Sequence, residues 1–136
     1  MTALPARTAT RAPRKAPVVR ASGPVVKFRM RITDGDAIAV GPGKIALLEA
    51  IDSTGSITAA AKQLDMSYRR AWMLLHALNG SLRLPAVDCA KGGQHGGGSA
   101  LTDEGRRLIQ VYRRIESTAQ LSCQNDIKQL MSMLSR

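Results

Sequence analysis

The chain has 136 residues, of which 44% are hydrophobic, so we expect one domain with a small core and tails. Its formal net charge of +10 at pH 7 favours nucleic acid, an acidic membrane surface or an acidic protein as partner, without choosing among them. Two cysteines, Cys89 and Cys123, exclude a disulfide framework, and no long apolar run indicates a signal peptide or a membrane span, so we expect a cytoplasmic protein with reduced, buried thiols and no membrane partner.

Residues 1–23 differ from the rest of the chain. They contain five basic residues, three prolines and no acid, and so carry half of the net charge. Such a segment cannot bury enough apolar surface to offset the entropy lost on ordering. The composition predicts a disordered basic arm. An organelle transit peptide has a similar composition, but the prolines disfavour the amphipathic helix that it needs.

The stretch "VVKFRMRI" alternates apolar and basic residues. A period of two is typical of a half-buried strand, so we expect a strand over residues 25–32, followed by a turn at "TDGD". The residues expected on its apolar face are Val26, Phe28, Met30 and Ile32.

Two helices are predicted next. The first begins near Pro42, which suits a first helical turn, and ends at Gly55. Its expected apolar face is Leu47, Leu48 and Ile51, with Lys44 and Glu49 exposed to solvent. The second is capped by Ser56 or Thr58, and its apolar face has helical spacing at Ile57, Ala60, Ala61 and Leu64.

A third helix follows, with Ser67 as its cap. We expect one face to hold Tyr68, Ala71, Leu75, Leu78 and Leu82, and the opposite face to hold Arg69, Arg70, Met73 and Ala77. Trp72 falls at the boundary between the faces, and Asn79-Gly80 is a place where the helix ends or loosens.

The second and third helices together indicate a helix-turn-helix, with a tight turn at Asp65-Met66. The second helix of such a unit enters the DNA major groove by its N-terminal end. An arginine there holds guanine in a bidentate contact or binds phosphate. The alternative is that the Arg69-Arg70 pair is only a solvated face.

A glycine-rich stretch, "KGGQHGGG" over residues 91–98, lies between strand candidates near 86–90 and 99–101. It lacks the spacing of a phosphate-binding loop or a dinucleotide fingerprint. A flexible linker fits the composition, but the flanks favour the tip of a β-hairpin, from which Lys91, Gln94 and His95 reach phosphates or a minor groove. The alternative is that the glycines only make the turn.

No metal, cofactor or catalytic site is predicted. The chain has two cysteines and two histidines, too few and too scattered for the spacing of a zinc site. Asp88, His95 and Ser99 are crowded around the glycine loop, where nothing holds the geometry of a catalytic triad.

Residues 103–136 are predicted to form a long helix capped by Thr102, with Asp103 and Glu104 in its first turn. It has more apolar surface than a small domain needs, and such surface usually finds a partner. We therefore expect a homodimer, with an interface formed by Val111, Tyr112, Ile115, Ile127, Leu130 and Leu134.

Two stretches, "GKIALLEAIDSTGSITAAAKQLDMSYRRAWMLLHALN" and "GGQHGGGSALTDEGRRLIQVYRRIE", resemble the DNA-binding domain of the molybdate-dependent transcriptional regulators, the ModE family. Gly-Ser-Ile before an alanine-rich helix, Met-Ser-Tyr-x-x-Ala-Trp, the glycine-rich wing and Leu-Thr-x-x-Gly match in order and spacing. The resemblance covers about residues 25–118. The first half also resembles LysR-type winged helices more distantly.

The resemblance implies a dimeric repressor or activator of genes for molybdate uptake and molybdenum enzymes. By position, Ser67, Tyr68, Arg69 and Arg70 fall in the recognition helix, and residues 91–98 in the wing. Full-length members carry C-terminal molybdate-binding domains, whereas this chain stops at Arg136. We therefore expect that the chain does not itself bind molybdate.

These observations predict an α+β, mainly α fold: a winged helix-turn-helix with an N-terminal strand and a long C-terminal dimerisation helix. The expected parts are the basic arm over 1–23, the DNA-binding domain over 24–102 and the C-terminal helix over 103–136. The expected function is sequence-specific regulation of transcription on double-stranded DNA, not catalysis. Alternatives are a sequence-nonspecific, chromatin-like protein and a winged-helix module for protein interaction.

Overall fold

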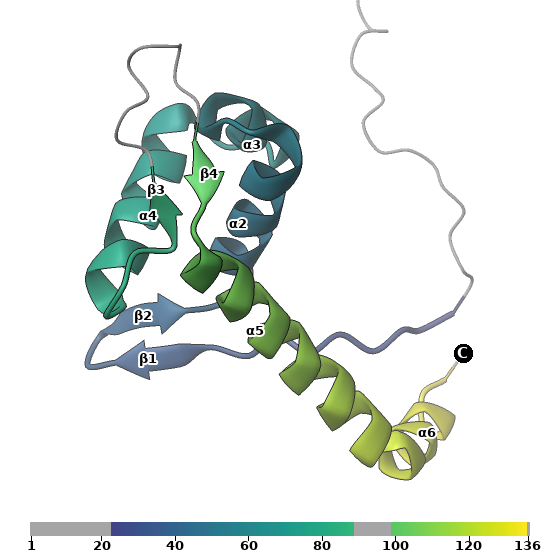
Figure 1. Cartoon of the computed structure of the whole chain (residues 1–136). Helices are drawn as coiled ribbons and strands as arrows, with labels where there is room; N and C mark the ends of the chain where they lie inside the picture. Colours follow the sequence, from purple (N-terminus) through teal and green to yellow (C-terminus); the bar gives the residue numbers. More distant parts are fainter. Residues whose placement is uncertain (1–22, 89–98, 136) are drawn as a thin grey trace, which may run out of the picture.

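The computed structural model describes residues 23–88 and 99–135. Figure 1 shows a helical body with two short strand pairs and a long helix, α5, that projects away. The elements in chain order are β1 (Ile32–Asp34), β2 (Ala37–Val40), α2 (Pro42–Thr54), α3 (Ile57–Gln63), α4 (Tyr68–Ser81), β3 (Val87–Asp88), β4 (Ala100–Leu101), α5 (Asp103–Ser122) and α6 (Gln124–Ser132).

The core lies where α2, α3 and α4 meet. The apolar face predicted for α2 is confirmed, because Leu47, Leu48 and Ile51 are fully buried. Ala60 and Ala61 of α3 are buried as well, and their small side chains let the α3 backbone approach its neighbours closely. The three helices thus form one apolar core that fixes the position of α4.

Three helix ends follow the predicted cap chemistry. Gly55 ends α2 in the left-handed conformation with φ 80°, and its N–H donates to Ile51 O. Ser56, and not Thr58, caps α3, since its Oγ accepts a hydrogen bond from Ala59 N at 2.9 Å. Thr102 Oγ1 accepts from Gly105 N at 3.0 Å and caps α5.

The predicted N-terminal strand over 25–32 is wrong in its extent. Strand β1 begins only at Ile32 and pairs antiparallel with β2, which the sequence pattern did not reveal, across the predicted turn. The alternation still describes the preceding segment correctly, because Val26, Phe28 and Met30 are half-buried while the basic residues between them are exposed. Ile32 is exposed, against expectation. In the segment before β1, side-chain burial therefore alternates although these residues are not part of a strand.

Lys44 is not exposed to solvent as predicted, but buried. Its ammonium donates to Ile38 O at 2.6 Å and to Ala39 O at 3.4 Å, so the first turn of α2 holds the end of β2. Burial lowers the pKa of Lys44, because a low-dielectric environment disfavours the charged form.

The predicted long C-terminal helix is two helices. Helix α5 ends at Ser122, and α6 begins at Gln124 after a break at Cys123. The expectation of buried cysteines is wrong for Cys123, which is exposed at this break; Cys89 lies outside the described residues. Figure 1 shows α6 turned away from the axis of α5.

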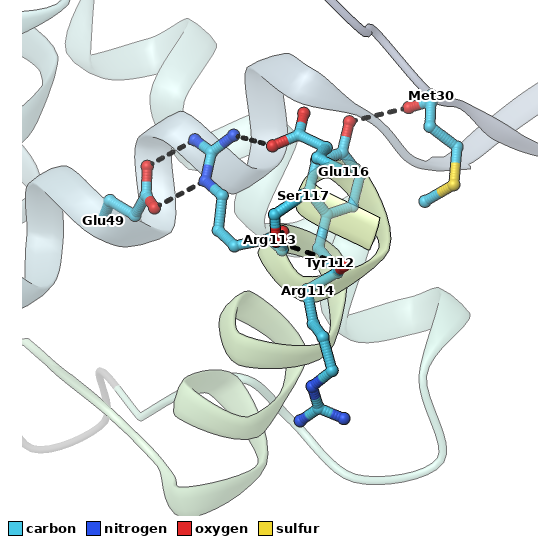
Figure 2. A network of polar contacts seen from close by, with 7 residues as sticks. All are labelled: Met30, Glu49, Tyr112, Arg113, Arg114, Glu116 and Ser117. Carbon is cyan, nitrogen blue, oxygen red and sulfur yellow. Dashed lines mark hydrogen bonds and ion pairs between the residues drawn. The ribbon is translucent and has the colours of Figure 1, made fainter. Parts of the chain in front are cut away.

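Two neighbouring residues attach α5 to the body of the domain (Figure 2). Tyr112 is 2% exposed, and its hydroxyl donates to Met30 O at 2.8 Å. Arg113 donates to both carboxylate oxygens of Glu49 on α2, at 2.9 and 2.7 Å, and to Glu116 at 2.6 Å. These hydrogen bonds, that with Glu49 first, raise the pKa of Arg113. Tyr112 is thus part of the monomer core, which corrects its assignment to a dimer interface.

Candidate nucleic-acid interface

The connection between α3 and α4 has the geometry of a helix-turn-helix. Asp65 adopts the left-handed conformation with φ 56°, which aspartate tolerates better than most residues. Met66 N then donates back to Ala61 O at 3.0 Å. This hydrogen bond fixes the angle between α3 and α4, at the position where the sequence predicts the turn.

The start of α4 presents most of the residues predicted to contact DNA. Ser67 caps the helix, since its Oγ accepts from Arg70 N at 3.0 Å. Arg69 and Arg70 are exposed, and neither guanidinium pairs with a carboxylate of the described residues. Met73 is 55% exposed. Tyr68 is 52% exposed, so its assignment to the buried apolar face of the helix is wrong. The same exposure leaves the side chain accessible to DNA, as its predicted role as a DNA contact requires.

Trp72 continues this exposed surface along α4. Its side chain is 44% exposed, in agreement with the predicted boundary position. The indole stacks on the imidazole of His76, one turn further along, with ring centroids 4.9 Å apart and an angle of 9° between the planes. The sequence-based set of DNA contacts includes neither of these two rings.

The wing is the β3–β4 hairpin together with the residues that connect its strands. Val87 pairs with Leu101 and Asp88 with Ala100, in antiparallel register, which confirms the predicted hairpin. Figure 1 shows the two strands of this hairpin, β3 and β4, beside α4. The predicted contact residues Lys91, Gln94 and His95 lie outside the described residues.

Asn79 holds the wing against α4, a role that the sequence did not reveal. Its Oδ1 accepts from Ala86 N at 2.8 Å, and its Nδ2 donates to Val87 O at 3.3 Å. Thr102 adds a second link, because its Oγ1 donates to Pro85 O at 2.6 Å and its N–H to Ala86 O at 2.9 Å. The sequence signal, Asn-Gly in a helix, predicts a helix end, but α4 continues to Ser81.

Other chemistries find no support in the part of the chain that the structure describes. Within residues 23–88 and 99–135, no three His, Cys, Asp or Glu side chains come together to hold a metal ion. No helix among these residues is both long and apolar enough to cross a bilayer. The exposed basic and aromatic start of α4 is therefore the candidate site.

Known proteins are similar to this chain over the same region. Residues 43–106 match the family of bacterial regulatory helix-turn-helix proteins of the lysR family. The molybdenum-pterin-binding protein MopB of Rhodobacter capsulatus is 46% identical over 78 residues, which is 57% of this chain and 29% of MopB. The molybdenum transport protein ModE of Azotobacter vinelandii is 41% identical over 88 residues, which is 65% of this chain and 33% of that protein. The chain contains a helix-turn-helix domain that is similar to these ModE and MopB proteins, hereafter the ModE-type domain.

A solved structure supports the fold of this ModE-type domain. The crystal structure of the CbnR_DBD–DNA complex superposes with a TM-score of 0.51 at 23% sequence identity, over 65% of this chain and 95% of the other. A solved structure with so low a sequence identity is evidence for the winged-helix fold and not for a shared function. The β1–β2 hairpin of the ModE-type domain precedes the residues that match the lysR family.

The ModE-type domain is a part of what its relatives contain. This chain spans about a third of the length of the relatives it matches, 29% of MopB and 33% of the Azotobacter ModE. The matched residues 43–106 include α4 and the β3–β4 hairpin, so the similarity bears on the candidate site itself.

Proposed function

We propose that this chain is a sequence-specific, DNA-binding regulator of transcription that acts through its ModE-type domain. The observation that carries the proposal is the capped start of α4, where Arg69 and Arg70 stand exposed without a carboxylate partner among the described residues. The N-terminal end of the second helix of a helix-turn-helix contacts base edges in the major groove. Two free guanidinium groups at that place match guanine and phosphate.

The genes under control are, in this proposal, those for molybdate uptake or for molybdenum enzymes. Support comes from relatives named as a molybdenum transport protein ModE and as transcriptional regulators ModE, at 40–41% identity across this domain. Within the chain, residues 24–102 contact DNA. Lys91, Gln94 and His95 of the wing reach the backbone, and residues 1–23 add attraction that depends on charge rather than on sequence.

A binding assay tests this function directly. The full chain is first used to select duplexes from a random library, and its affinity is then measured for a selected duplex and for a scrambled one at several salt concentrations. A regulator binds the selected duplex on the order of 10³-fold or more tightly at physiological salt. Equal, steeply salt-dependent affinities indicate the chromatin-like alternative, and binding to neither duplex indicates a protein-interaction module.

Arg69→Ala and Arg70→Ala test the recognition helix. Each arginine that contacts a base should contribute about 1–3 kcal/mol to binding of the selected duplex, and fluorescence anisotropy measures the loss. Unfolding midpoints should stay at the parent value, because both side chains are exposed.

The matched control for these variants is Arg29→Ala. It removes the same charge from an exposed position on the segment before β1, which Figure 1 shows running past α5. The control should lower affinity slightly and equally for selected and scrambled duplexes. Parent affinity in both α4 variants contradicts the proposed orientation of α4 on DNA.

We also propose that two chains pair through α5 and α6, to match two half-sites about 34–36 Å apart on DNA. The support is exposed apolar surface, which in this proposal a second copy covers. Apart from Tyr112, the sequence-based interface residues are exposed or half-buried: Val111, Ile115, Ile127, Leu130 and Leu134. Leu121 and Met133, in the same two helices or directly after them, are exposed as well.

Light scattering checks this pairing. At micromolar concentration the parent should have twice the 14.6 kDa mass of one chain. The double variant Leu130→Asp with Leu134→Asp should be monomeric, because the charges would be desolvated in the interface. Leu84→Asp is the matched control, an exposed leucine outside α5 and α6, and should leave the dimer intact. A monomeric parent removes the proposal.

A further inference from the structure

We propose that α4 recognises thymine in the major groove, through apolar contact of Tyr68, Trp72 and Met73 with the C5 methyl group. This inference rests on the proposed function and adds to it the class of base pair that the domain selects. Thymine is the base that presents a methyl group in the major groove, and apolar side chains are its matching contact.

The first support is the amount of apolar surface on an otherwise basic end of the helix. Tyr68, Trp72 and Met73 are 52%, 44% and 55% exposed. Tyr68 and Trp72 are separated by four positions and so are neighbours on the helix surface. Met73 follows Trp72 directly and points about 100° further round the helix, on the side of Arg69 and Arg70. All three are in the first half of α4, the part of a recognition helix that contacts base edges.

The second support is that the indole is already held in place. Trp72 stacks on His76 with the ring planes within 9° of parallel. A side chain that is ordered before binding loses less conformational entropy when it contacts DNA.

The third support comes from the groups that are missing from this face. Adenine is recognised in a bidentate manner by Asn or Gln, and α4 has one Asn, Asn79, and no Gln. Both ends of the Asn79 amide are used on Ala86 N and Val87 O. The Ser67 hydroxyl is engaged in the helix cap. An A·T pair facing α4 is therefore recognised through its thymine and not through its adenine.

The surrounding charge identifies DNA as the occupant of this apolar surface. Arg69 and Arg70 lie between Tyr68 and Met73 in the sequence and have no ion-pair partner among the described residues. A guanidinium pair beside apolar side chains matches a groove that has phosphates at its edge and methyl groups on its floor. An apolar protein surface would leave both guanidinium groups without a partner.

The experiment replaces thymine by deoxyuridine in the selected duplex, one position at a time. This change deletes the C5 methyl group and keeps every Watson–Crick hydrogen bond. At positions that α4 contacts, the parent protein should bind the deoxyuridine duplex about fourfold more weakly for each methyl group lost. Thymines outside the half-sites serve as internal controls and should show no change.

Protein variants assign the contact to α4. In Trp72→Ala and Met73→Ala, the ratio of affinities for the thymine and deoxyuridine duplexes should fall towards one at the positions concerned. In Arg69→Ala the overall affinity should fall while that ratio stays at the parent value. Met73→Ala remains informative if Trp72→Ala unfolds, since the Met73 side chain is the more exposed of the two.

Two results overturn the proposal. A ratio of one at every thymine for the parent protein shows that no methyl group is recognised, even though the selected duplex is still bound. A parent ratio that all the α4 variants retain places the contact on another element. Both differ from failure of the proposed function, in which the selected duplex is not preferred over the scrambled one.

Discussion

Replacing Gly105 by alanine is expected to lower the free energy of unfolding by about 2–3 kcal/mol. Gly105 is buried in the first turn of α5, and a methyl group on its Cα would overlap the carbonyl oxygen of Ala86. That carbonyl also accepts a hydrogen bond from Thr102 N at 2.9 Å. Helix α5 and the backbone of Ala86, the residue before β3, are therefore held at a distance that only glycine permits.

Whether the Gly105 variant is less or more stable than the parent shows whether packing or helix propensity dominates at this position. In an exposed helix interior, alanine is about 1 kcal/mol more favourable than glycine. Gly80→Ala is the matched control, because Gly80 lies in α4 with no atom within 4 Å of an added Cβ. Urea unfolding should show the Gly80 variant equal to the parent or more stable. A Gly105 variant as stable as the parent means that α5 can move away from Ala86 at no cost.

The helical core was predictable because its signals are local. The spacing of Leu47, Leu48 and Ile51 defines one face, and that face is buried. Periodicity places a residue at an angle on a helix, but it does not say where the neighbouring elements end. Helical spacing therefore predicts that Lys44 is exposed, although its ammonium is bound to the end of β2, and that Tyr68 faces the core, although it is 52% exposed.

The parts that the sequence did not predict depend on contacts between distant segments. Alternation from Val26 to Met30 indicates which side chains face inward, but not whether the backbone finds a partner strand. The segment instead lies against α5, as the hydrogen bond between Tyr112 and Met30, 82 residues apart in sequence, shows. The break at Cys123 occurs without a glycine or proline near it, so local chemistry did not mark it.

The candidate site likewise contains residues that the sequence predicts and one that it does not. Ser67, Arg69, Arg70 and Met73 were predictable, because a cap and exposed basic side chains mark the start of a helix. Asn79 was not, because its hydrogen-bond partners follow in the loop and strand after α4, seven and eight residues later.

Replacing Asn79 by alanine should lower the free energy of unfolding by about 2–3 kcal/mol and weaken DNA binding as well. The variant leaves Ala86 N and Val87 O without the amide partner, and both residues are buried. A buried polar group that loses its partner costs about 1–3 kcal/mol. Binding falls because the same two hydrogen bonds set the position of the wing relative to the recognition helix.

Asn125→Ala is the matched control for stability, since Asn125 is exposed on α6, and it should leave the free energy of unfolding at the parent value. Native-state hydrogen exchange then separates a local effect from a global one. In Asn79→Ala the Ala86 amide should exchange faster than in the parent by more than the change in global stability accounts for, because its hydrogen-bond acceptor is gone. If instead Ala86 keeps its protection and the duplex is bound with parent affinity, the links from Thr102 to Pro85 and Ala86 hold the wing in place by themselves, and Asn79 has no part in positioning it.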